Sequence, residues 1–428
     1  MTVVAHATDR RLPLDREMVE RLSRARHEPP WLLDARLDAL TRYREAPWPT
    51  GQEEEWRRFS LRDLPRNVLD GVAPPGGVQR IEELAGDDRR NGVTADHFGK
   101  AVESVPHLIQ PFIADAGGVP SHRALRDLAR TLFSHGSTFV HVPRGVRVSR
   151  PIVLTKRWPG GDGAIVLRTL VVAEAGSRVT VVEDLSSDDG PARVAVPLLE
   201  VHAGVGAEVR YVRVHRFASG VWDVGSQLYT SASDSRLESY NVLVGSSRTK
   251  LGVLSDIRGN GAEVKLYGLV AAGADQRIDV NSLQRLDGRA SQSDLLYLSA
   301  LYEEAKATYY GVVRVEPTSS GTGSYQECRN LLLSDRAGAN PIPVLEILTN
   351  DVARCGHGAT AGKIDEEEVF YVLSRGVDRA TAEQLLVRGS FARVIDRIPE
   401  AATRARVLEA LRPRIGRIAE LEMAEAAA

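Results

Sequence analysis

A four-residue pattern that recurs in the middle of the chain is the feature that most constrains its fold. Each copy consists of a turn residue, a small residue, a charged residue and a branched aliphatic residue, and the copies begin at Gly176, Gly206, Asp234 and Gly261. These starts are 30, 28 and 27 residues apart. A loose period of this size is typical of stacked coils, in which each coil buries its apolar face against its neighbours.

The residues around these copies have the pattern of short β-strands. Residues 179–183, 208–215 and 263–268 alternate apolar with polar side chains over at least part of their length, as half-buried strands do. We expect one helix at 123–132, and after it this strand-like pattern continues to residue 347. Evenly spaced short strands also fit a β-sandwich or a barrel, so the spacing alone leaves the solenoid and the sandwich open.

The two ends of the chain have helical patterns. Residues 1–119 combine helical periodicity with several breakers, and the stretch 64–91 has the composition of a linker. Near the C-terminus, Asp365 is a candidate N-cap before an apolar run, and Gly376 is a candidate stop. A second helix is expected over 380–398. We therefore divide the chain into an N-terminal helical domain with linker (1–119), a β core (120–350) and a C-terminal helical domain (351–428).

Composition excludes several classes of protein. The formal net charge of −2 lacks the basic field that drives binding to nucleic acid. Two cysteines cannot build a disulfide framework, and the first thirty residues contain no apolar run that resembles a signal peptide. No segment approaches the roughly 20 apolar residues that cross a bilayer. We expect a protein of the cytoplasm with no membrane and no nucleic acid partner.

One short segment, residues 351–360, carries candidate metal ligands. Cys355 and His357 lie two residues apart, and we expect the flanking Gly356 and Gly358 to let the backbone bend around His357. Thiol and imidazole groups bind soft and borderline metals, but two ligands do not close a tetrahedral site. Taken alone, such a histidine is more often a turn or hydrogen-bonding residue, and such a cysteine a small buried apolar residue. Metal chemistry here requires a partner surface.

Four segments carry a resemblance to a known family. They are residues 28–37 (EPPWLLDARL), 136–151, 329–335 (RNLLLSD), and 351–360 continuing into 364–376. Together they resemble the SufB/SufD family of iron–sulfur cluster assembly proteins over most of the chain. The resemblance implies a mainly β fold, a right-handed parallel β-helix flanked by N-terminal and C-terminal helical domains. It thereby favours the solenoid over the sandwich.

Within this family, the chain is more similar to the SufD-like members. SufB-like chains carry a cysteine on a core strand, where this chain has Ile347, and a glutamate directly after the histidine, where it has Gly358. Cys328 lies in a segment with similar letters, but upstream and out of register. The chain also departs from many relatives at residues 279–282, where they carry a histidine.

The resemblance implies a role in the SUF assembly complex. It implies a scaffold subunit that pairs with SufB through their β-helices, that binds the SufC ATPase through its C-terminal helices, and that can form a homodimer when isolated. His357 and Cys355 are implied to handle a transient Fe–S cluster shared with SufB. The implied SufC-binding residues are Asp365, Phe370, Tyr371, Arg375 and Gly376. The chain has no Gly-x-x-x-x-Gly-Lys-Ser/Thr segment, so we expect a non-catalytic subunit that binds no nucleotide.

Other functional interpretations of the same residues remain open. A SufB-like homodimeric scaffold and an inert structural paralogue are the related alternatives. A β-helical polysaccharide lyase or hydrolase is a more distant one, because such enzymes need clustered carboxylates. The candidates for that cluster are Asp275, Asp279, Asp287 and Asp294. Phe370, Tyr371 and Leu373 also fit the core stripe of an amphipathic helix.

Overall fold

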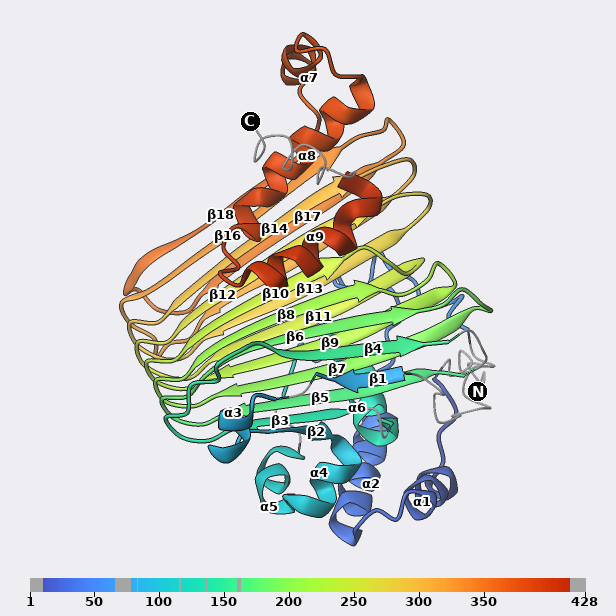
Figure 1. The fold of residues 1–428 in the computed structure, drawn as a ribbon, viewed down its shortest axis with the longest axis vertical. Coiled ribbons are helices and arrows are strands. Elements are labelled where there is room, and N and C mark those ends of the chain that lie inside the picture. The colour runs from blue at the N-terminus through green and yellow to red at the C-terminus, as the bar shows by residue number, and fades with distance from the viewer. Residues whose placement is uncertain are drawn as a thin grey trace, which may run out of the picture.

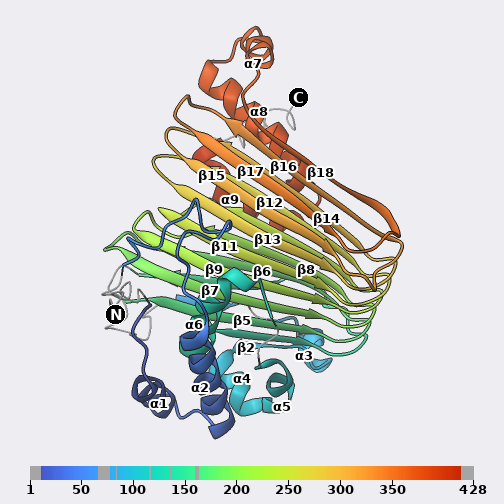
Figure 2. The same ribbon diagram turned by 180° about the vertical axis from the view of Figure 1, so that it is seen from behind.

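The protein is a parallel β-helix with helices at both ends. The computed structural model describes residues 11–65, 78–82, 84–114, 117–134, 137–159 and 163–415. The solenoid has about eight turns, and its helical ends are visible in Figures 1 and 2. Strands that follow one another in the chain alternate between two sheets, and strands two apart pair in parallel. This connectivity confirms the solenoid and excludes the sandwich.

Each coil contributes one strand to each of two sheets. Sheet A consists of β1 (Val78–Ile81), β4 (Ile152–Trp158), β6 (Arg178–Ser187), β8 (Glu208–Arg216), β10 (Arg236–Leu243), β12 (Glu263–Ala272), β14 (Gln292–Leu301), β16 (Thr322–Leu332) and β18 (Val352–Lys363). Sheet B consists of β2 (Thr94–His97), β3 (Thr138–Val142), β5 (Ile165–Ala173), β7 (Arg193–Ala203), β9 (Val221–Ser231), β11 (Arg248–Ile257), β13 (Arg277–Leu286), β15 (Lys306–Val315) and β17 (Gly338–Ile347). The short strands β1 and β2 pair antiparallel at the N-terminal end.

The repeated sequence pattern is the corner that leads into a strand of sheet A. Its first residue has a positive φ in every copy: 68° at Gly176, 64° at Gly206, 58° at Asp234 and 67° at Gly261. The amide of this residue donates to a carbonyl of the next coil, as from Gly176 to Val205 at 2.8 Å. Glycine and aspartate tolerate this left-handed conformation better than most residues. The period of the sequence is therefore the length of one coil.

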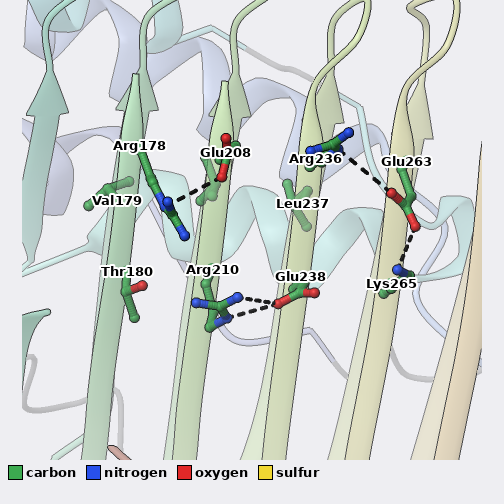
Figure 3. Close-up of a pocket in the computed structure, with 11 residues that line it drawn as sticks. Arg178, Val179, Thr180, Glu208, Arg210, Arg236, Leu237, Glu238, Glu263 and Lys265 are labelled. Atoms are coloured by element: carbon green, nitrogen blue, oxygen red, sulfur yellow. Dashed lines mark hydrogen bonds and ion pairs between the residues drawn. The ribbon is translucent and has the colours of Figure 1, made fainter. Parts of the chain in front are cut away.

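The other three positions of the pattern alternate between the inside and the outside of the solenoid. The small second residue is buried in each copy: Ser177, Ala207, Ser235 and Ala262. The aliphatic fourth residue packs in the central core: Val179, Val209, Leu237 and Val264. The charged third residue faces outward and alternates in sign, which allows the pairs Arg178–Glu208 at 3.4 Å and Arg236–Glu263 at 3.9 Å. Figure 3 shows these pairs on neighbouring strands.

The N-terminal helices lie at one end of the solenoid, and some of them pack on strands of sheet B (Figure 2). They are α1 (Arg16–Ala25), α2 (Pro30–Glu45), α3 (Gly86–Arg90), α4 (Phe98–Ser104), α5 (Pro106–Ile109) and α6 (Arg123–Leu132), with 3-10 turns at Gln110–Phe112 and Pro120–His122. Helix α6 has the predicted bounds and packs between α2 and strands β5, β7 and β9. The expected linker contains β1 and α3, and its residues 66–77 and 83 lie outside the described residues.

Buried ion pairs hold these helices to the sheet. The carboxylate of Glu200 on β7 accepts from Arg130 of α6 at 2.7 Å and from Arg168 of β5 at 2.5 Å. All three side chains are almost fully buried. Arg168 also donates to the carbonyl oxygen of Phe112 at 3.0 Å. Because a charge buried without its partner is costly, this network fixes the 3-10 turn at Phe112 against the sheet.

Two of the C-terminal helices lie on the outer face of sheet A, and the first one projects beyond the last strands (Figure 1). The C-terminal helices are α7 (Glu366–Leu373), α8 (Arg379–Ile395) and α9 (Ala401–Ile415). Helices α8 and α9 lie across strands β8, β12 and β14 and share a hydrophobic cluster with them (Figure 1). Asp365 caps α7 by accepting from the amide of Glu367 at 2.8 Å, and Gly376 has a φ of 91° after the helix end. The expected cap and second helix are thus present.

The β-helix ends later than the boundary at residue 350. Residues 352–363 form β18, which pairs in parallel with β16 over its length. The segment that carries Cys355 and His357 is therefore the last strand of sheet A. Among the helices of the described residues, none combines the length and apolarity needed to cross a membrane.

Candidate functional site

The C-terminal end of the β-helix is an open edge. Within the described part of the chain, β18 pairs only with β16, and β17 pairs only with β15. Figure 2 shows these last strands at the end of the solenoid opposite the N-terminal helices. Edge strands present unpaired N–H and C=O groups that readily pair with another chain. This end is therefore a potential docking site for a partner strand.

Cys355 lies on the interior face of β18. It is in register with the buried Ser324 of β16, and its half-buried side chain packs against the central core of the solenoid. Burial raises the pKa of its thiol. Because iron binds the thiolate, this position favours the neutral thiol until a metal or a nearby cation compensates.

His357 lies on the same face of β18 as Cys355, because side chains two residues apart in a strand point to the same side. Its register partner is Gln326, which is buried inside the preceding coil. His357 itself is exposed, since no further coil among the described residues covers it. No hydrogen bond or ion pair of its imidazole is found among the described residues. The ring is thus available to a ligand at the mouth of the solenoid interior.

The glycines on either side of His357 do not bend the chain, contrary to expectation. Gly356 and Gly358 lie in the extended strand β18 on its outer face. A Cβ at Gly358 would lie 3.0 Å from the hydroxyl oxygen of Tyr325, and one at Gly356 would lie 3.5 Å from the ring. The glycines therefore leave room for the tyrosine ring on the neighbouring strand β16.

Ile347 lies at the same open end, on the last strand of sheet B. It is in register with Val315, which is buried in the core, so Ile347 lies on the interior face of β17. Its side chain is 41% exposed, and the following Leu348 is exposed as well. An apolar group therefore occupies the position at which SufB-like chains were expected to carry a cysteine.

Helix α7 presents a second exposed apolar surface. Phe370 is 71% exposed and Tyr371 is 61% exposed, whereas Val369 is buried. The guanidinium of Arg375 lies 5.0 Å from the centre of the Tyr371 ring and donates to its hydroxyl at 2.8 Å. The alternative that Phe370, Tyr371 and Leu373 form the core stripe of the helix is wrong for Phe370 and Tyr371, whereas Leu373 packs against the cluster that contains Val369. Exposed aromatic residues beside an arginine are typical of protein interfaces.

Comparisons with known proteins identify the family. Residues 157–390, more than half of the chain, match the sequence model described as the SUF system FeS cluster assembly, SufBD core domain. The chain belongs to the SufBD family. It is 24% identical over 417 residues to the iron–sulfur cluster assembly protein SufD of Bacillus subtilis, an alignment that covers 91% of this chain and 95% of that protein.

Other SufBD relatives are similar to the chain over comparable lengths. A SufBD family protein of Mycobacterium tuberculosis strain H37Rv is 28% identical over 374 residues, covering 85% of this chain and 88% of the relative. The SufB protein of Bacillus subtilis is 24% identical over 412 residues, covering 88% of each chain. Both branches of the SufBD family are therefore represented among these relatives.

Cys328 does not join Cys355 and His357 in one site. It is buried on β16 in register with Ala359, four residues along the strand from the position of Cys355, which corresponds to about 13 Å. Burial raises the pKa of the Cys328 thiol to about 12. Throughout the described residues, no group of three or more His, Cys, Asp or Glu side chains is arranged to hold a metal ion. This SufBD chain therefore presents one thiol and one imidazole, the two candidate ligands, at its open end.

The carboxylates of the lyase alternative do not form a cluster. Each is engaged by a different group: Asp275 by Arg248, Asp279 by Lys250, Asp287 by Thr318 and Asp294 by Arg354. The charged side chains on the outer face of sheet A in Figure 3 also form ion pairs, such as Arg210 with Glu238 at 2.7 Å. The groove that these side chains line contains neither cysteine nor histidine. Neither place offers a pair of carboxylates free to act as acid and base.

Sheet B carries a buried polar cluster that the sequence pattern did not predict. His122 lies 3.0 Å from the amide oxygen of Asn281 and packs on the Trp56 ring, with centroids 5.0 Å apart. Asn281 and Lys250 both donate to Asp279, at 3.0 and 2.9 Å. An imidazole from a distant segment thus meets residues 279–282, where many relatives carry their own histidine. The four segments are far apart in sequence, so no local motif indicates the cluster.

Proposed function

We propose that the protein is a SufD-like scaffold subunit of the SUF system, which pairs with SufB, binds the SufC ATPase and helps to hold a nascent Fe–S cluster as cargo. The observation that carries the proposal is the placement of Cys355 and His357 on the interior face of the edge strand β18, which pairs only with β16 among the described strands. Membership of the SufBD family supports a role in Fe–S cluster assembly, and the free edge of the strand supports docking of a partner chain.

The ligand set explains why a partner is needed. Iron in Fe–S clusters is held by several thiolates or imidazoles, and this end of the chain offers one of each. A second β-helix that docks on β17 and β18 would bring further ligands to the mouth of the solenoid. Ile347 and Gly358 favour the SufD-like role, because the cysteine and glutamate expected of SufB-like chains are absent at these positions.

The exposed surface of α7 supports SufC as the second partner. Phe370, Tyr371 and Arg375 form its centre, while Asp365 and Gly376 set the two ends of the helix. The chain lacks a phosphate-binding loop motif, so ATP hydrolysis would come from SufC. In this proposal the chain is a non-catalytic subunit of the cytoplasm.

A SufB-like homodimeric scaffold is the second candidate. Its support is that the Bacillus subtilis SufB and SufD proteins are equally similar to this chain, at 24% identity. It would use the same open edge with a second copy of the chain. Its weakness is the apolar Ile347 at the position where a thiol is expected.

Co-expression with SufB and SufC tests the pairing. We expect Leu348→Asp, which puts a charge at the open end, to reduce recovery of SufB with the tagged chain at least tenfold. Val205→Asp is the matched control, because Val205 is an equally exposed aliphatic residue in a corner of a distant coil. Undiminished recovery of SufB with Leu348→Asp would contradict docking at β17 and β18. Iron and sulfide bound by a homodimer of this chain without SufB would favour the second candidate.

A further inference from the structure

A cavity of about 470 Å³ lies on the outer face of sheet B, several coils from the open end. It is located where β5, β7 and β9 end, beside the 3-10 turn that carries Phe112. Apolar and polar side chains both line it, including Phe112, Val172, Ala203, His202, Ser231 and Arg258. A cavity of this size and mixed lining is within the range of sites that bind small molecules.

The inner wall of the cavity contains an imidazole with an unused nitrogen. His202 is in register with Thr230, and its Nδ1 lies 2.7 Å from the Thr230 hydroxyl. Phe112 covers the ring with centroids 4.7 Å apart. The Nε2 atom is buried and has no hydrogen-bond partner among the described residues, as is true of the hydroxyl of Ser231. Leaving such a group unpaired costs about 1–3 kcal/mol, which a bound ligand would recover.

The wall around His202 is rigidly supported. The carbonyl of Phe112 accepts from the buried Arg168, which is itself bound to Glu200. Burial lowers the pKa of His202 to about 4, so its imidazole is neutral near pH 7. The cavity is therefore preformed, with a neutral polar group at its inner wall.

The rim of the cavity carries positive charge. Arg258 donates from Nε to the buried carboxylate of Asp256 at 2.7 Å, and Arg285 donates to the same carboxylate at 2.8 Å. Two guanidinium groups thus share one carboxylate. Arg144 and Arg258 are the arginines that line the cavity, and Glu174, whose carboxylate accepts from the Arg144 amide at 2.9 Å, is the carboxylate among the lining residues. The balance at the rim favours an anionic ligand.

We propose that this cavity binds a small organic anion, with an apolar, ring-sized body against Phe112 and Val172, an anionic group at Arg258 and Arg144, and a polar atom bonded to Nε2 of His202. The apolar wall excludes a free inorganic ion as the best occupant, because most of the cavity would stay unfilled. The site is separate from Cys355 and His357, so the proposal does not depend on the proposed function.

Isothermal titration of the full chain with benzoate and with phenyl phosphate tests this site. We expect at least one probe to bind with a Kd below 5 mM, and the stronger of the two distinguishes a carboxylate from a phosphate ligand. His202→Phe keeps a ring but removes the free nitrogen, and Arg258→Gln removes the rim charge. Each substitution should weaken binding at least fivefold without lowering the thermal midpoint by more than a few degrees.

Arg157→Gln is the matched control, because Arg157 is about as exposed as Arg258 and has one carboxylate partner, Asp188, which follows strand β6. It should leave the affinity for both probes unchanged. If neither probe binds at concentrations up to 20 mM, the proposal is overturned. It is also overturned if Arg258→Gln binds a probe with wild-type affinity. Because Arg258 is exposed, its variant remains informative even if His202→Phe does not fold.

Discussion

At the scale of single residues, two buried histidines couple stability to pH. Burial lowers the pKa of His122 to about 3 and that of His202 to about 4. In the unfolded chain a histidine binds its proton near pH 6.5. The unfolded state therefore gains protons first as the pH falls, and the free energy of unfolding decreases from about pH 6.5 downward.

We expect this effect to cost about 2 kcal/mol per histidine at pH 5. Urea unfolding at pH 7.5 and pH 5.0 measures it. His122→Gln should reduce the difference between the two pH values by about that amount, whatever it does to stability at pH 7.5. An identical pH dependence in the variant and the wild type would show that His122 is not buried in its neutral form.

The two cysteines should differ in reactivity. Cys355 is half-buried at the open end, whereas Cys328 is buried inside the preceding coil. In the isolated native chain at pH 8, we expect iodoacetamide to label Cys355 slowly and Cys328 only after denaturation, because alkylation requires an accessible thiolate. Peptide mass spectrometry gives the rates. If SufB docks at this end, its addition should protect Cys355; an unchanged rate would argue against docking there.

At the scale of structural elements, the corner of each coil sets the backbone conformation that a residue must adopt. Gly206 has a φ of 64°, and Ala290 occupies the equivalent corner before β14 with a φ of 52°. Alanine is strained in this region by about 1 kcal/mol or more, and glycine is not. Gly206→Ala should therefore lower the free energy of unfolding by about 1 kcal/mol, while Ala290→Gly should raise it slightly or leave it unchanged.

Thermal and urea unfolding of the two variants measure these opposite changes. A Cβ at Gly206 meets no atom within 4 Å, so its effect reports backbone strain rather than a clash. Equal destabilisation by both substitutions would mean that φ at the corner does not explain the repeated pattern.

The same corner explains which elements the sequence could predict. A left-handed turn, a buried small residue and an inward aliphatic residue are local requirements, so they appear as a repeat in the sequence. The cap at Asp365 is local as well, and its carboxylate accepts an amide hydrogen bond at the start of the helix. By contrast, Gly356 and Gly358 look like bend residues in the sequence, and only the neighbouring Tyr325 shows their role. The contacts of His122 and of His202 depend on strands brought together by the coils, so no local pattern predicts them.

At the scale of the whole molecule, two exposed surfaces lie near one end of the solenoid and would engage different partners. We expect the double substitution of Phe370 and Tyr371 by alanine to abolish capture of SufC by the tagged chain. The thermal midpoint should stay within a few degrees of the wild type, because both side chains are largely exposed. Glu367→Ala, an exposed residue of the same helix, is the control. If the double variant captures SufC as fully as the wild type, SufC must contact a different surface of the chain.

The position of His357 at the mouth of the solenoid makes its substitution the most direct test of the proposed role. The complex with SufB and SufC would be purified without air, as wild type, as His357→Ala and as Thr360→Ala, which alters an exposed residue of the same strand. Bound iron and acid-labile sulfide would be measured per complex. We predict equal recovery of all three complexes, with bound iron and sulfide reduced at least fivefold in His357→Ala alone. Wild-type iron and sulfide in His357→Ala would contradict it and leave this chain a structural subunit.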